Sequence, residues 1–141
     1  MRFWDSSAIM PLLVLEQETE QCIRAYQSDQ EVMVWTMSKA EVFSALCRRS
    51  REGALKEIDF DSGKKRMNDF FDKAFEVISV QKVNDRALRL LQVHPLRAAD
   101  AMQLASVLVA TQEHTSRVPI MSFDGRLILA AKREGFTVNP D

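Results

Sequence analysis

The chain has 141 residues, of which 46% are hydrophobic and 28% are charged, and its formal net charge is -1. These values are typical of a single globular domain over residues 1–141 and argue against a disordered chain or a membrane protein. Because the charge is balanced, the chain as a whole does not favour nucleic acid, and RNA or DNA would have to be bound by a local basic patch.

The sequence also predicts the cellular compartment of the protein. No secretion signal precedes the first apolar segment and no uncharged stretch is long enough to cross a membrane, so we expect a cytoplasmic protein with no membrane contact. Cys22 and Cys47 are isolated from each other and from histidine, which argues against a zinc site or a disulfide. We expect His94 and His114 at the surface or at helix ends.

Strand-like and helical patterns alternate along the first half of the chain. The apolar segment Arg2–Trp4 ends at Asp5-Ser6-Ser7 and predicts a strand that leads into a helix. Val32–Trp35 is a compact apolar run of the kind found in strands buried on both faces. The other elements predicted here are helices over 8–15, 18–26 and 39–51, the last stopped by Gly53.

The second half continues the alternation. Its predicted elements are an amphipathic helix over 59–75, a strand over 76–80, a helix from 84 or 85 to 93, a helix over 96–110, a strand over 118–122, a helix over 126–134 and a strand over 136–138. This order predicts an α/β fold whose parallel sheet is covered on both faces. In such sheets ligands bind at the carboxyl ends of the strands.

The segment Leu96–Ala110 is apolar almost all the way round a helix, which predicts a central and largely covered helix. Asp100 lies in its first turns, and a buried carboxylate there needs a helix terminus, a basic side chain or a metal ion to compensate its charge. Taken alone, Asp100 is explained by a favourable interaction with the helix dipole. Other carboxylates at the same place would change that interpretation.

Three further carboxylates follow predicted strands, and each also has a structural explanation. Asp5 can cap the helix after the first strand. Glu41 has capping-box spacing from Ser38 and would then bond back to the Ser38 amide. Asp124, after the fourth strand, can begin a turn with Gly125 or cap a helix.

In the predicted fold these three acids and Asp100 meet at one edge of the sheet. Carboxylates brought together repel one another and raise each other's pKa unless a cation joins them. Mg²⁺ and Mn²⁺ take oxygen ligands and leave positions open for phosphate oxygens and an attacking water. The coincidence therefore predicts a site for one or two divalent cations.

The acids belong to short motifs that occur in this order: Asp5-Ser6-Ser7-Ala8, Glu41, Leu96-Arg97-Ala98-Ala99-Asp100-Ala101 and Ser122-Phe123-Asp124. In this order the motifs resemble those of the PIN domain, and most of all those of the VapC toxins of bacterial and archaeal toxin–antitoxin pairs. The resemblance covers nearly the whole chain, although the bulky pair Phe3-Trp4 departs from the aliphatic residues usual before the first aspartate.

The resemblance implies a three-layer α/β/α sandwich with a five-stranded parallel sheet, and a ribonuclease that depends on Mg²⁺ or Mn²⁺. It also implies a homodimer and a small antitoxin protein whose tail lies in a groove beside the two middle helices. The acidic site implied is formed by Asp5, Glu41, Asp100 and Asp124, with the hydroxyls of Ser7 and Ser122 in support.

Basic residues near these acids are candidates for binding RNA phosphates. Arg48, Arg49 and Arg51 continue the helix that begins near Glu41, and Arg97 is the nearest basic residue to Asp100. A solvated helix face, with its charges balanced by neighbouring acids, is the open alternative for the first three. Candidates to line the partner groove, which equally suit a core, are Phe60, Phe70, Phe71 and Phe75.

Three other functions would use the same residues. A catalytically idle PIN-like module that binds a protein or RNA would have little reason to keep four mutually repelling acids. A phosphoaspartyl enzyme would use Asp5 as nucleophile, but the segment after it lacks a second aspartate. A deoxyribonuclease with the same acids stays open.

Overall fold

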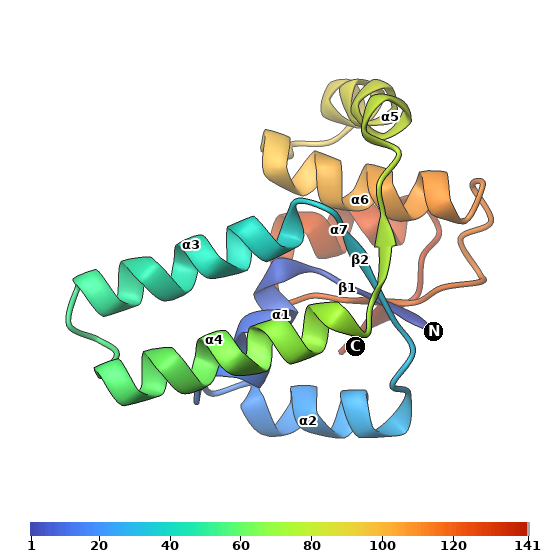
Figure 1. Cartoon of the computed structure of the whole chain (residues 1–141). Coiled ribbons are helices and arrows are strands. Elements are labelled where there is room, and N and C mark those ends of the chain that lie inside the picture. Colours follow the sequence, from blue (N-terminus) through green and yellow to red (C-terminus); the bar gives the residue numbers. More distant parts are fainter. Residues whose placement is uncertain (141) are drawn as a thin grey trace.

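The computed structural model describes residues 1–140 and contains a five-stranded sheet in the order β3-β2-β1-β4-β5 (Figure 1). Every neighbouring pair of strands is parallel. The predicted parallel α/β sheet is therefore confirmed. The strands are β1 (Arg2–Trp4), β2 (Val32–Trp35), β3 (Phe75–Val77), β4 (Ile120–Met121) and β5 (Val138–Asn139).

Helices connect the strands and cover both faces of the sheet. No helix within residues 1–140 combines the length and hydropathy needed to cross a membrane. The helices are α1 (Ser6–Leu13), α2 (Thr19–Ser28), α3 (Ser38–Arg51), α4 (Glu57–Asp72), α5 (Val80–Val93), α6 (Ala98–Ala110) and α7 (Gly125–Arg133).

Two hydrophobic cores lie on opposite faces of the sheet because successive strand residues point to opposite sides. Phe3, at the centre of the sheet, packs into a core completed by α5, α6 and α7. Its neighbour Trp4 packs into the other core, against α1, α2, α3 and α4. The result is the expected α/β/α sandwich, from which α3 and α4 project together as a helical hairpin (Figure 1).

The boundary around β3 differs from the sequence-based expectation. The helix predicted over 59–75 ends at Asp72, so Phe75 belongs to β3, and Val80, expected in a strand, begins α5. β3 is an edge strand paired only with β2, and Phe75 and Glu76 are exposed. An apolar run at such an edge does not mark a doubly buried strand, and the Val83 amide already bonds to the Ser79 carbonyl in helical spacing.

The order of the strands in the sheet places the first residues of three helices at the edge formed by the carboxyl ends of the strands. From the central β1 the sheet grows on one side through β2 and β3 and on the other through β4 and β5. The direction of growth reverses beside β1, which is where ligands bind in open α/β sheets. The helices α1, α3 and α7 begin just after the carboxyl ends of β1, β2 and β4.

Candidate metal centre

Asp5 directly follows β1 and is held by two hydroxyl groups from different parts of the chain. Ser7 Oγ donates to Asp5 Oδ2, and Ser122 Oγ donates to the same oxygen over 2.9 Å. The Ser7 amide also donates to Oδ2, so Asp5 is the N-cap of α1, as its structural interpretation predicted. The two hydroxyls accept in turn from the amides of Phe123 and Asp124, which ties the start of α1 to the end of β4.

Burial raises the pKa of Asp5 from its ordinary value of 3.8 to about 6. The hydrogen bonds from Ser7 and Ser122 lower this pKa, but they only partly offset the lost hydration, and the nearby charge of Asp124 raises it further. All three hydrogen bonds recorded for the carboxylate within residues 1–140 reach Oδ2. Oδ1 is left as a free acceptor for a cation.

Glu41 lies in the first turn of α3, and its carboxylate points to other helices. It accepts from Ser6 Oγ over 3.0 Å and lies 3.3 to 3.4 Å from Gln103 Nε2. The capping-box interpretation is wrong, because Ser38 is already inside the helix and its hydroxyl bonds to Gln103. The pKa of Glu41 is raised, mainly by burial and also by the charge of Asp100.

Asp100 and Asp124 occupy the starts of α6 and α7. Asp124 Oδ1 accepts from the Leu127 amide over 2.9 Å and caps α7, as predicted. Asp100 is half-buried and lies just before the buried run Gln103–Leu108 of α6. Burial and then the charge of Asp124 raise the pKa of Asp100, while Arg97 and Arg126 lower it.

The negative charges of the four predicted acids are therefore close enough to affect pKa values within the group. Asp124 raises the pKa of both Asp5 and Asp100, and Asp100 raises that of Glu41. Among residues 1–140, none of the four forms an ion pair with a basic side chain. A cluster of this kind keeps an electrostatic cost that a bound cation would remove.

The donor set fits a hard, hydrated cation. Within the described residues no three acidic, histidine or cysteine side chains are close enough to bind one ion together. Mg²⁺, however, is commonly held by only one or two carboxylates and keeps several of its waters. The arrangement suits Mg²⁺ or Mn²⁺ bound directly by one or two of these acids, with the remaining acids reaching the ion through water.

Arginines lie on two sides of the acids. Arg97 and Arg126 line an open cavity of about 630 Å³ with Asp100 and Asp124. Arg48 and Arg49 line a second cavity, of about 410 Å³, whose other residues include Ser6, Ser7, Glu41 and Phe123. Arg49 is paired with Glu16, and Arg51 lines neither cavity. Of the predicted basic residues, the structure brings Arg48, Arg49 and Arg97 to the acids.

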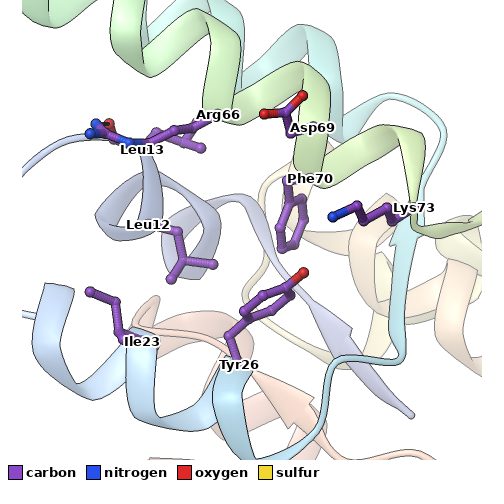
Figure 2. Close-up of a pocket in the computed structure, with 8 residues that line it drawn as sticks. All are labelled: Leu12, Leu13, Ile23, Tyr26, Arg66, Asp69, Phe70 and Lys73. Carbon is purple, nitrogen blue, oxygen red and sulfur yellow. Dashed lines mark hydrogen bonds between the residues drawn. The ribbon is translucent and has the colours of Figure 1, made fainter.

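The four phenylalanines proposed for a partner groove do not line one pocket together. Phe70 is buried and lines an apolar pocket of about 270 Å³, with Leu12, Leu13, Ile23 and Tyr26 from α1 and α2, and charged side chains of α4 beside it (Figure 2). The other three do not line this pocket: Phe60 packs on Phe43, Phe71 packs on Phe70, and Phe75 is exposed in β3.

The sequence alone did not predict that Ser6, Ser38, Gln103 and Arg126 lie beside the acids. Arg126 directly follows the Asp124-Gly125 pair, so its place beside a predicted acid was a usable signal. Gln103 and Ser38 are 65 positions apart, and nothing in their local patterns predicts that they meet. Their contact depends on how α6 packs against the start of α3.

Comparison with known proteins gives two relatives that act as ribonucleases. The chain is 33% identical over 101 residues to the ribonuclease VapC3 of Pyrobaculum aerophilum, a match that covers 72% of this chain and 76% of that protein. It is 26% identical over 138 residues to the ribonuclease VapC45 of Mycobacterium tuberculosis, covering 98% and 94%. No protein-family model matches the chain.

A solved structure has the same fold. The structure of VapC20 of Mycobacterium tuberculosis, described as a sarcin–ricin loop cleaving toxin, superposes with a TM-score of 0.67 over 97% of each chain. At 16% sequence identity this match establishes the α/β/α architecture and leaves the chemistry to the residues.

Proposed function

Since this chain belongs to the VapC ribonuclease family of PIN-domain proteins, we propose that it is a metal-dependent endoribonuclease and the toxin of a toxin–antitoxin pair. The observation that carries the proposal is the group of four carboxylates at the carboxyl edge of the sheet, where Asp124 raises the pKa of Asp5 and Asp100, and Asp100 raises that of Glu41. None of the four forms an ion pair with a basic side chain within residues 1–140. Such a cluster suits a divalent cation and the phosphate groups of a nucleic acid.

In this proposal the four acids have different roles. Asp5, Asp100 and Asp124 hold Mg²⁺ or Mn²⁺ directly or through water, and Glu41 completes the shell or orients the hydrolytic water. When bound, the cation makes water nucleophilic at neutral pH and stabilises the leaving 3′-oxygen, so that the product carries a 5′-phosphate. Ser7 and Ser122 keep Asp5 in place by donating to its Oδ2.

The function is tested by incubating the purified protein with a panel of RNAs in Mg²⁺, Mn²⁺ or EDTA. We expect cleavage with either ion, no cleavage above background in EDTA, and 5′-phosphate ends on the products. A catalytically idle module is the second candidate, favoured by the absence of three closely grouped ligands within residues 1–140. It predicts RNA or protein binding without cleavage under any of these conditions.

The two arginine-lined cavities suggest the path of the RNA. We expect the strand to cross the acids with its phosphates near Arg48 on one side and near Arg97 and Arg126 on the other. Each phosphate contact with single-stranded RNA adds about 0.7 to the slope of log affinity against log salt concentration. Replacing Arg97 and Arg126 together by alanine should lower that slope by about 1.4.

The measurement is RNA binding in EDTA over a series of salt concentrations. Arg133→Ala is the matched control, since Arg133 lies at the opposite end of α7 from Asp124. It should leave the slope unchanged. An unaltered slope in the double variant would show that these arginines do not contact phosphate.

We further propose that the antitoxin is recognised at the apolar pocket between α1, α2 and α4 (Figure 2). Leu12 and Leu13 of the pocket lie at the end of α1 that is farther from Asp5, so a bound segment would have to run about 10 Å along the helix to reach the acids. A homodimer is also part of the proposal. Its support is the exposure of three apolar residues, Val80, Leu88 and Leu91, within one side of α5.

A further inference from the structure

The side chain of Gln103 is at the centre of a polar network inside the protein. It projects from α6, is 1% exposed, and lies between the first turns of α1 and α3. Its Nε2 atom lies 2.9 Å from Ser6 Oγ and 3.0 Å from Ser38 Oγ, and 3.4 and 3.3 Å from the two oxygens of Glu41. One amide group therefore joins three helices at the point where Glu41 enters the site.

The acceptors around this amide fix its orientation. With Nε2 toward Glu41, the two N–H donors face a carboxylate and two hydroxyl oxygens, while Oε1 accepts from Ser38 Oγ. The flipped amide would place a carbonyl oxygen against the Glu41 carboxylate and leave Ser38 Oγ as the one recorded acceptor near its two N–H donors. At least one buried donor would then lose its partner, which costs about 1 to 3 kcal/mol. Only one orientation satisfies the network.

The chemistry of the donor also suits a carboxylate that must keep its charge. A lysine or arginine at this position would pair with Glu41 and compete with a cation for it. A neutral amide instead stabilises the ionised carboxylate while leaving its negative charge uncompensated. Ser6 Oγ adds a second neutral donor, over 3.0 Å to Glu41 Oε2.

Gln103 and Asp100 are one helical turn apart on α6, so they share a face of a helix whose following turns are buried. The helix therefore sets the place of Asp100 directly and that of Glu41 through the amide. We propose that Gln103 is a positioning residue that holds the Glu41 carboxylate in the orientation needed for RNA cleavage. The inference rests on the proposed nuclease function.

The positioning role is tested with Gln103→Met and Gln103→Glu, whose new side chains are similar in size to glutamine. Both variants lose the hydrogen bonds that the amide donates, but they differ in charge. Loss of an outer partner of a catalytic group typically lowers activity about 10- to 100-fold. We expect that loss in kcat for both variants, with KM for RNA within about two-fold of wild type, because substrate contacts are untouched. Ser106→Ala is the control: it removes a buried hydroxyl that bonds only to the backbone of the same helix, and it should leave kcat unchanged.

A second measurement needs neither metal nor RNA, because it records the NMR signal of the Gln103 side-chain amide. In EDTA, the side-chain amide signal of Gln103 in a ¹H–¹⁵N spectrum should move on substitution Glu41→Gln, and those of Gln81 and Gln92 on α5 should not. This measurement needs no Gln103 variant to fold. A Gln103 signal that stays in place, or variants that cleave with wild-type kcat, would overturn the positioning role. Absence of cleavage by the wild-type protein would instead contradict the proposed function and leave the spectroscopic result to decide the inference.

Discussion

Substitution of Asp5 by asparagine is expected to reduce RNA cleavage by at least about 10²- to 10³-fold, which is the usual cost of losing one charge-stabilising group at a reacting centre. Asparagine has nearly the same shape and can accept the hydroxyl bonds from Ser7 and Ser122. The substitution therefore removes the negative charge of the buried carboxylate while keeping the cap of α1. Initial rates on one RNA at saturating Mg²⁺ measure the effect.

Asp100→Asn should reduce cleavage by a similar factor, because Asp100 belongs to the same series of interacting acids. Asp85→Asn is the matched control, since Asp85 lies on α5 and lines a separate cavity with Lys82 and Arg89. Its cleavage rate should equal that of the wild-type protein. If both site variants kept full activity while folded, the acidic site would be wrongly assigned.

The fold could be predicted from the sequence where local pattern and burial agree. All four residues of Val32–Trp35 are buried, and an apolar run of this length between turn residues has few other solutions. The prediction failed around Phe75 and Val80, where apolar residues lie at an exposed edge strand and at a helix start. Phe75 continues the helical spacing of Phe70 and Phe71, and Val80 ends an apolar run of the strand type, so local pattern assigns both positions to the wrong element.

The acids of the site were found because they follow strands, and the carboxyl ends of parallel strands meet at one edge. Their supporting partners were missed for the opposite reason. Ser38 fitted a capping box, yet its hydroxyl bonds to Gln103, which lies on another helix. Hydrogen bonds between residues so far apart in the chain depend on tertiary packing, which spacing in the sequence does not record.

The metal-free protein should lose stability as the pH rises from about 4 to 6, contrary to the usual behaviour of carboxylates. The pKa of Asp5 is raised from 3.8 to about 6 on folding, so the folded state binds the proton more tightly than the unfolded state between these values. With the free energy of unfolding changing by 1.36 kcal/mol per pKa unit, the contribution of Asp5 is about 3 kcal/mol. Raised pKa values of Glu41 and Asp100 act in the same direction.

Urea unfolding in EDTA at several pH values isolates this effect when wild type and Asp5→Asn are compared, because other titrations cancel in the difference. The variant should gain about 2 kcal/mol relative to wild type between pH 4 and pH 7, because part of the full contribution is already lost at pH 4. Asp29→Asn is the control, because the pKa of Asp29 is shifted in the opposite direction to that of Asp5. The ammonium group of Met1 lowers the pKa of Asp29, so the stability that Asp29 contributes is lost only as the pH falls below about 4. A wild-type-minus-variant difference that stays constant from pH 4 to 7 would mean that the buried Asp5 carboxylate is compensated without a cation, and the case for a metal at this edge would lose its main electrostatic support.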